Sequence, residues 1–182
     1  MNIVQSPAEI LRTPAVAVNF SGPKLQKIII DMTETLRAQK DPPGVGLAAN
    51  QVGLPYRLFL ARFSTKKDEP VHVFINPEIL DHSAELQPSP DDKKPQLEGC
   101  LSRPNYYGLV QRWQWVRLKY LNKNLKLKIE NFRGFPAVVV QHEMDHLSGK
   151  IFIERILEQG GKLYKLTGKD KKGKDIWQEV EI

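Results

Sequence analysis

The sequence predicts an α+β fold in which antiparallel sheets surround a central helix. Alternating apolar residues in the middle of the chain predict strands, and a helical spacing of apolar residues predicts one helix before them and one after them. A chain of 182 residues can bury one hydrophobic core but is short for two. Residues 1–182 are therefore interpreted as a single domain, in which residues 160–182 form a basic C-terminal extension.

The composition indicates a folded protein of the cytoplasm. Hydrophobic residues make up 41% of the chain, which argues against disorder. No apolar run approaches the length of about 18 residues that a membrane span needs, and Met1 to Leu11 lacks the features of a secretion signal. One cysteine cannot form an internal disulfide. We expect a cytoplasmic, reducing location and no membrane association.

The net charge of +6 leaves two interpretations open. Part of the positive excess lies between Lys162 and Lys174. This segment could contact an anionic partner such as ribosomal RNA, or it could be a solvated segment that only aids solubility. No DNA partner is expected.

The first predicted helix covers Pro23 to Lys40. Its apolar residues recur three and four positions apart, and Ser21 is available to cap its start. These apolar residues are Leu25, Ile28, Ile29, Met32 and Leu36. The Asp-Pro-Pro-Gly sequence at residues 41–44 ends the helix, because proline lacks a backbone donor and restricts the residue before it.

Alternation of apolar and polar residues predicts strands in the middle of the chain. The predicted strands are Tyr56 to Arg62, Val71 to Ile75 and Trp113 to Tyr120. Leu125, Leu127 and Ile129 alternate with lysines in the same way. Residues 82–96 contain three prolines and no periodicity, and are expected to form an exposed loop.

The second predicted helix begins after Gly134. Pro136 is tolerated in its first turn, and Gly149 is placed to end it. Residues at helical spacing along it are Phe135, Val138, Val139, His142, His146 and Leu147. Beyond this helix, Ile176 to Ile182 alternates weakly, as an edge strand does.

The second helix carries a candidate metal site. His142 and His146 are four residues apart, so both imidazoles lie on one helical face within reach of one ion. Glu143 follows the first histidine, where a carboxylate can move a proton between water and a leaving group. The alternative is a helix with two partly buried histidines that bind no metal.

A catalytic metal site of this kind needs a third protein ligand and one open position. Cys100 is the best candidate, because it lies between Glu98-Gly99 and Ser102, where a thiolate could face a cleft. The alternative is an inert, buried thiol.

Residues 44–51 form a glycine- and alanine-rich segment, Gly-Val-Gly-Leu-Ala-Ala-Asn-Gln. Its small residues allow another backbone to come close, and the side-chain amide of Gln51 could stabilise an oxyanion. The segment lacks the lysine and the length of a P-loop. In isolation the segment is interpreted as a simple turn.

Together and in this order, the three segments resemble the motifs of the peptide deformylase family. These motifs read Gly-apolar-Gly-apolar-Ala-Ala-x-Gln, Glu-Gly-Cys-apolar-Ser and Gln-His-Glu-x-Asp-His, and all three are intact here. The likeness extends from Ile10 to Phe152. It implies an enzyme that removes the formyl group from N-formyl-Met nascent peptides.

The resemblance also implies a role for each motif residue. Cys100, His142 and His146 would bind one divalent metal, Fe²⁺ in the first place, with Zn²⁺, Ni²⁺ or Co²⁺ as replacements. Glu143 would be general base and then acid. Gln51 and the backbone N–H of Leu101 would receive the formyl oxygen as charge develops.

The resemblance further implies how the peptide is held. It would add as a strand beside the Gly44 to Gly46 segment. Its methionine side chain would lie in an apolar pocket lined by Val45, Phe135, Val138 and Val139; the alternative is that these residues are ordinary core.

Some expectations and alternatives concern residues and functions outside the motifs. Glu98 and Asp145 are expected to support the metal ligands, and Arg103 is expected to project toward the peptide beyond formyl-Met. Two other functions fit parts of the sequence: a zinc endopeptidase, and an RNA- or ribosome-binding module with a structural metal. Cys100 disfavours the first, and the lack of an obvious fourth ligand beyond His72 or His82 disfavours the second.

Overall fold

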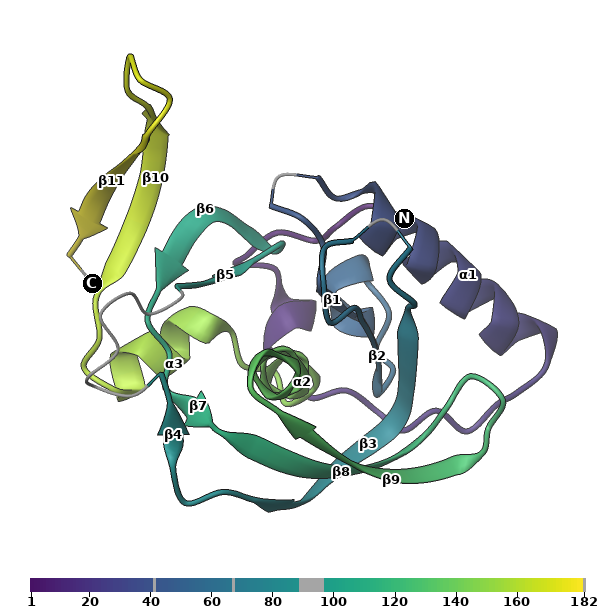
Figure 1. Cartoon of the computed structure of the whole chain (residues 1–182). Coiled ribbons are helices and arrows are strands. Elements are labelled where there is room, and N and C mark those ends of the chain that lie inside the picture. The colour runs from purple at the N-terminus through teal and green to yellow at the C-terminus, as the bar shows by residue number, and fades with distance from the viewer. Residues whose placement is uncertain (41, 67, 89–96, 182) are drawn as a thin grey trace.

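The computed structural model of the chain describes residues 1–40, 42–66, 68–88 and 97–181. Helix α2 (Phe135–Leu147) lies at the centre, and Figure 1 looks along it. Antiparallel sheets and the other helices surround it. The predicted α+β fold with a central helix is therefore confirmed.

The larger sheet has five strands in the order β1-β2-β3-β8-β9, and all its neighbours are antiparallel. The strands are β1 (Gly46–Ala48), β2 (Leu58–Ala61), β3 (His72–His82), β8 (Trp115–Leu121) and β9 (Leu127–Arg133). The predicted strands are all present, with shifted ends. β1 was not predicted, because its small residues belong to the motif segment and show no alternation.

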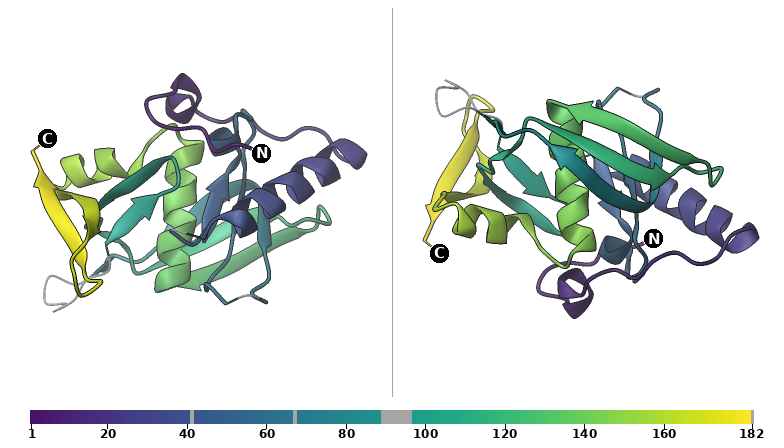
Figure 2. Two further views of the ribbon diagram at one scale, coloured as in Figure 1. Left: turned by 90° about the horizontal axis from the view of Figure 1, so that it is seen from above. Right: turned by 90° about the horizontal axis from the view of Figure 1, so that it is seen from below.

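The smaller sheet has four strands in the order β11-β10-β6-β5. They are β5 (Glu98–Cys100), β6 (Arg103–Gly108), β10 (Leu163–Lys169) and β11 (Asp175–Val180). β11 is the predicted edge strand, although Ile182 lies outside the described residues. The hairpin of β10 and β11 projects from the body beside β6 (Figures 1 and 2).

Part of the predicted loop at residues 82–96 is ordered into a strand. β4 (Leu86–Gln87) pairs with β7 (Arg112–Trp113) to form a two-stranded sheet. The expectation of a loop throughout is therefore wrong for these residues, because a partner strand far along the chain satisfies their backbone. Residues 89–96 lie outside the described part of the chain.

Helix α1 (Pro23–Ala38) begins where it was predicted and ends two residues before Lys40. Its N-cap is Gly22 with φ of 71°, so Ser21 does not cap it. Leu25, Ile28, Met32 and Leu36 are buried in one cluster with residues of β1 and β2. Among the described helices, none is long and apolar enough to cross a membrane.

Helix α2 is buried along nearly its whole length. It begins after Gly134 with Pro136 in its first turn, and Gly149 follows its end with φ of 74°. Every residue from Val139 to Leu147 is buried, including all the polar ones. Buried polar groups need partners, so the surroundings of α2 must supply them.

Strand β9 places its alternating apolar residues on the side opposite to the core. Leu127 is 59% exposed and Ile129 is 48% exposed, whereas Phe132 is buried. The strand prediction is confirmed, and the apolar residues that predicted it face away from the core. The inner side is polar at the free end of the hairpin, where the Tyr120 hydroxyl donates a hydrogen bond of 2.6 Å to Glu130.

Candidate metal centre

Strand β5 and helix α2 bring one thiol and two imidazoles together. Cys100 ends β5, and His142 and His146 lie one helical turn apart on α2. One ligand atom from each lies within 4.8 Å of the other two. The Sγ atom of Cys100 is 3.2 Å from Nε2 of His146. The structure therefore brings together the three residues that the sequence predicted as metal ligands.

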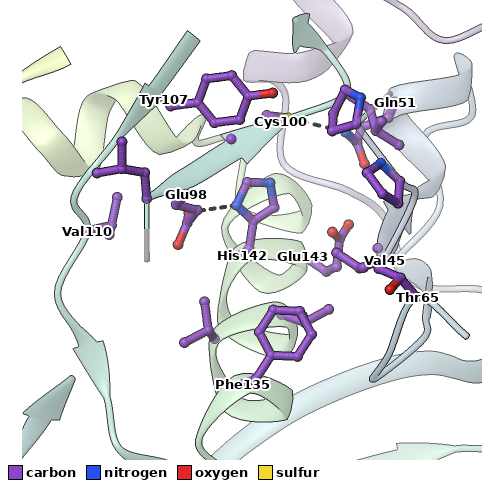
Figure 3. Close-up of a pocket in the computed structure, with 18 of the residues that line it drawn as sticks. Val45, Gln51, Thr65, Glu98, Cys100, Tyr107, Val110, Phe135, His142 and Glu143 are labelled. Atoms are coloured by element: carbon purple, nitrogen blue, oxygen red, sulfur yellow. Dashed lines mark hydrogen bonds and ion pairs between the residues drawn. The ribbon is translucent and has the colours of Figure 1, made fainter. Parts of the chain in front are cut away.

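Glu98 orients one of the imidazoles. Nδ1 of His142 donates a hydrogen bond of 2.7 Å to Oε1 of Glu98, as Figure 3 shows. Burial opposes ionisation of Glu98, but the charges of Arg112 and His142 and their hydrogen bonds outweigh it and lower the pKa of Glu98 to about 2. The carboxylate can only accept, so Nδ1 carries the proton and Nε2 is available as a ligand.

Arg112 is a buried cation that the sequence did not single out. It donates to both carboxylate oxygens of Glu98, at 3.0 and 2.6 Å, and to Oδ2 of Asp145 at 2.6 Å. Asp145 also accepts two hydrogen bonds from Arg155. Arg112 thus joins the two predicted supporting groups, whereas the partly exposed Arg155 bonds only to Asp145 of the two. Glu98 contacts the predicted ligand His142 directly, and within the described residues Asp145 is linked to it only through Arg112 and Glu98. A lone arginine in a sequence carries no sign of burial, so neither arginine could be predicted.

The environment of Cys100 favours the thiolate. Burial opposes ionisation, but the charges of His146 and His142 and their hydrogen bonds outweigh it and lower the pKa of Cys100 to about 5. Nε2 of Gln51 also donates to Sγ at 3.4 Å. A bound metal would take the place of the imidazole protons, and a thiolate with two neutral imidazoles is a donor set that zinc and iron accept. The residues present therefore fit a single divalent metal ion.

Glu143 lies beside these ligands with one oxygen unsatisfied. Its side chain is 2% exposed, and Oε2 has no hydrogen-bond partner among the described residues. Burial raises the pKa of Glu143 to about 7. A carboxylate that changes protonation near neutral pH is suited to general acid–base chemistry.

Gly46 leaves the space that this carboxylate occupies. A Cβ atom built on Gly46 would lie 2.7 Å from Cδ of Glu143, well inside contact distance. β1 therefore packs its backbone directly against the carboxylate. The second glycine of the Gly-Val-Gly motif is thus explained by close approach to Glu143.

Gln51 is held so that its amide nitrogen faces Cys100. It lies in the 3₁₀ helix Ala49–Val52, and its Oε1 accepts a hydrogen bond of 2.8 Å from the backbone of Ala48. This contact directs Nε2 toward Cys100 and toward Oγ of Ser102, at 3.2 Å. The amide therefore presents donors to the space beside the thiolate.

A cavity of about 570 Å³ opens at these residues. Figure 3 shows Phe135 at one end and Tyr107 at the other, with Glu98, His142 and Glu143 between them. The residues predicted to hold the substrate all line it: Val45, Gly46, Phe135, Val138 and Val139. Gln51 and Leu101, the predicted oxyanion donors, line it too.

Some lining residues were not predicted, and Arg103 is placed differently from its expected position. Leu97, Gly99 and Val110 line the cavity as well as Tyr107. Arg103 is absent from the described lining, and its guanidinium lies 4.3 Å from the ring centroid of Tyr106. Successive residues of a strand point to opposite faces, so Tyr107 turns toward the cavity while Tyr106 packs beside the cluster around α3 (Phe152–Glu158).

A buried thiolate and two imidazoles, with a carboxylate beside them and an apolar cavity in front, are the groups that a metal-dependent hydrolase needs. The chain belongs to the polypeptide deformylase family, whose model matches residues 1–161.

Relatives and solved structures of this family resemble the chain over most of its length. The peptide deformylase of Mesorhizobium japonicum is 40% identical over 151 residues, covering 82% of this chain and 80% of the relative. Peptide deformylase 1 of Bacillus subtilis is 40% identical over 154 residues, covering 85% and 88%. The crystal structure of Arabidopsis thaliana peptide deformylase 1B in complex with an inhibitor has a TM-score of 0.76 and 31% identity, covering 87% of this chain and 83% of the other.

Proposed function

We propose that the chain is a peptide deformylase, a metal-dependent hydrolase that removes the formyl group from the initiator methionine of nascent polypeptides. The observation that carries this proposal is the position of Glu143. Its buried carboxylate, with one oxygen that has no partner among the described residues, lines the same cavity as Cys100 and His142.

The three ligands would hold one divalent metal ion, and we propose Fe²⁺ as the working ion. When bound, the ion supplies Lewis-acid activation of water and of the formyl carbonyl group. Cys100 contributes the negative charge, and Glu98 keeps His142 turned toward the ion. Zn²⁺, Ni²⁺ and Co²⁺ suit the same donors.

Glu143 would move the proton. It accepts a proton from the water molecule as the water oxygen adds to the formyl carbon. It then donates this proton to the amide nitrogen as the carbon–nitrogen bond breaks, so the products are formate and a free amino terminus. A pKa of about 7 allows Glu143 to perform both steps near neutral pH.

Gln51 and Leu101 would stabilise the charge that develops on the formyl oxygen. Nε2 of Gln51 is held in place by the hydrogen bond between its Oε1 and Ala48. The backbone N–H of Leu101 directly follows the thiolate ligand, at the wall of the cavity. Donors fixed before the reaction need no reorganisation during it.

The peptide would bind as an additional strand beside Val45 and Gly46, at the edge of the larger sheet. Its methionine side chain would lie among Phe135, Val138 and Val139. These three residues come from the first two turns of α2, which form one side of the cavity.

Deformylation is tested by an anaerobic assay on protein whose metal content has been measured. Formyl-Met-Ala-Ser is expected to release formate and an equal amount of free amine. A zinc endopeptidase would instead cleave between residues, whether or not the peptide carries a formyl group. Internal cleavage without formate release would disprove the proposal.

Iron dependence predicts loss of activity in air. Protein prepared without oxygen should lose most of its rate on exposure, because a thiolate beside ferrous iron is open to oxidation. The same protein loaded with Ni²⁺ or Zn²⁺ is the control and should keep a constant rate. Equal half-lives in air for the iron and nickel forms would contradict iron as the working metal and favour zinc or nickel.

Replacement of Gly46 by alanine is expected to lower kcat by about 100-fold, the effect of a displacement of roughly 1 Å in a catalytic group. The added Cβ atom must push the Glu143 carboxylate aside. Metal content should not change, because Glu143 is not a ligand in this proposal. Steady-state kinetics with metal analysis tests this.

The matched control is Gly161→Ala. This glycine also has a close neighbour, with its added Cβ 3.2 Å from Ile156, but it lies outside the cavity. It should keep the full rate. If both alanine variants are fully active, Gly46 does not hold space for Glu143.

We also propose one domain spanning residues 1–182, with residues 160–182 as a basic extension, and a cytoplasmic location. β10 pairs with β6 of the matched region, which ties the extension to the rest of the chain. The turn between β10 and β11 carries three lysines, Lys171, Lys172 and Lys174, and Lys169 ends β10 just before it. We propose that this turn contacts ribosomal RNA, which would make binding to ribosomes weaken steeply with salt.

A further inference from the structure

The wall of the cavity continues into the C-terminal hairpin. Gly99 of β5 and Tyr107 of β6 are cross-strand partners, and both line the cavity. A Cβ atom built on Gly99 would lie 2.6 Å from Cε1 of Tyr107, so the tyrosine ring lies over the bare backbone of β5. Tyr107 in turn pairs with Tyr164 of β10, and Tyr164 with Glu179 of β11.

Trp177 completes an aromatic surface on this face. Its ring lies 5.2 Å from that of Tyr107 and nearly perpendicular to it, at 89°. Directly paired residues share a face, as do residues two apart in one strand, so Tyr107, Tyr164 and Trp177 lie on the same side of the sheet. We call these three residues the aromatic shelf. Trp177 is 42% exposed.

The core packing of the hairpin uses the opposite face. Leu163 is buried in one cluster with Cys100, Phe152 and Ile156, and Val180 packs against this cluster. The hairpin therefore has an apolar attachment that does not require Trp177. The half-exposed indole on the other side is an aromatic group without a core role, placed next to a residue of the cavity wall.

The charged groups of the described residues nearest the shelf are either paired or lie on its other face. Glu179 pairs with Lys162 at 2.9 Å. Lys165 and Arg103 lie near the ring of Tyr106, on the face that packs beside α3. Within the described part of the chain, the shelf therefore offers mainly an apolar contact.

We propose that the aromatic shelf is a subsite for the peptide beyond formyl-Met, and that it selects an apolar side chain there. The proposal rests on the proposed deformylase function. The occupant is the substrate, because the shelf is continuous with the cavity through Tyr107.

The dimensions of the sheet predict which peptides reach the shelf. The backbone of Tyr107 is one strand spacing of about 4.8 Å from β5, and the ring centroids of Tyr107 and Trp177 are 5.2 Å apart. An extended peptide advances about 3.3 Å per residue. About three residues beyond formyl-Met are therefore needed for contact with Trp177, and formyl-Met-Ala is too short.

The test compares two substrates, formyl-Met-Ala and formyl-Met-Ala-Ala-Leu-Ala, with the metal-loaded full chain. Trp177→Ala should lower kcat/KM for the longer peptide by about two- to tenfold, the size of an aromatic contact, mainly through KM. Its rate with formyl-Met-Ala should stay at the wild-type value. Trp177→Phe should restore most of the loss, because it keeps an aromatic ring.

Ile176→Ala is the matched control. Ile176 is 45% exposed on the same strand, but its side chain points to the opposite face. This variant should match wild type with both peptides. A general weakening of the hairpin would lower kcat/KM for the longer peptide in both Trp177→Ala and Ile176→Ala. Loss of the aromatic shelf would lower it only in Trp177→Ala.

Two results would overturn the inference while deformylation stands: an unchanged ratio of long-peptide to short-peptide rates in Trp177→Ala, or an equal loss with both peptides. A wild-type protein that deformylates neither peptide would overturn the proposed function, and the subsite with it.

Discussion

Replacing Glu143 with glutamine is expected to lower kcat by about 100- to 10,000-fold, the range for a general acid–base group, while the protein keeps its metal. Glutamine has nearly the same shape as glutamate, so the tight space against Gly46 is still filled. It cannot accept a proton from water, so the variant removes the proposed proton transfer while it keeps the shape of the side chain. Formate release should therefore fall, whereas the metal content of the same preparation should stay at the wild-type value.

The control for this experiment is Glu158→Gln. Glu158 lies on α3 and is paired with Lys150 and Arg155 at the surface. Its variant should retain the wild-type rate. A fully active Glu143→Gln protein would disprove the proposed proton transfer. A variant that lost its metal would indicate that Glu143 is a ligand or a structural group.

Cys100→Ala is expected to lose the metal and, with it, all measurable deformylation. Even a residue that only orients a ligand typically changes metal affinity by about 10- to 100-fold, so the loss of a ligand should exceed this range. An inert buried thiol would behave differently. Its removal would leave a small cavity that costs roughly 1 kcal/mol of unfolding free energy, and the metal would stay.

Metal-to-protein stoichiometry after desalting distinguishes these outcomes, together with thermal unfolding of the metal-free forms. Val110→Ala is the control, because Val110 is buried in the same cluster as Cys100 but offers no ligand atom. It should keep its metal and lose some stability. Full metal occupancy in Cys100→Ala would show that the thiolate is not a ligand.

The central helix was the easiest element to predict from sequence. Its histidines, its proline in the first turn and the glycine after its end are all local signals, and they mark the helix to within a residue or two. The strands of the larger sheet were found by alternation because one of their faces is buried. β9 shows the limit of this signal, since alternation does not reveal which face is inside.

The smaller sheet was largely missed because its order depends on pairing. β5 has three residues, one of them glycine, and β6 begins Arg-Pro-Asn, which resembles a turn. These residues form strands only because they hydrogen-bond to neighbouring strands. Arg112 and Tyr107 were missed for a related reason. The burial of Arg112 and the orientation of Tyr107 toward the cavity both depend on residues far away in the chain.

The placement of β10 has a consequence for how the protein matures during translation. Cys100 emerges from the ribosome well before Leu163, yet both belong to one buried cluster. Until residues 163–169 have emerged and paired with β6, the apolar surroundings of the thiol are open on one side. Leu163 therefore cannot cover this cluster while the hairpin is still inside the ribosomal tunnel, and the buried surroundings of Cys100 are completed only after β10 has emerged.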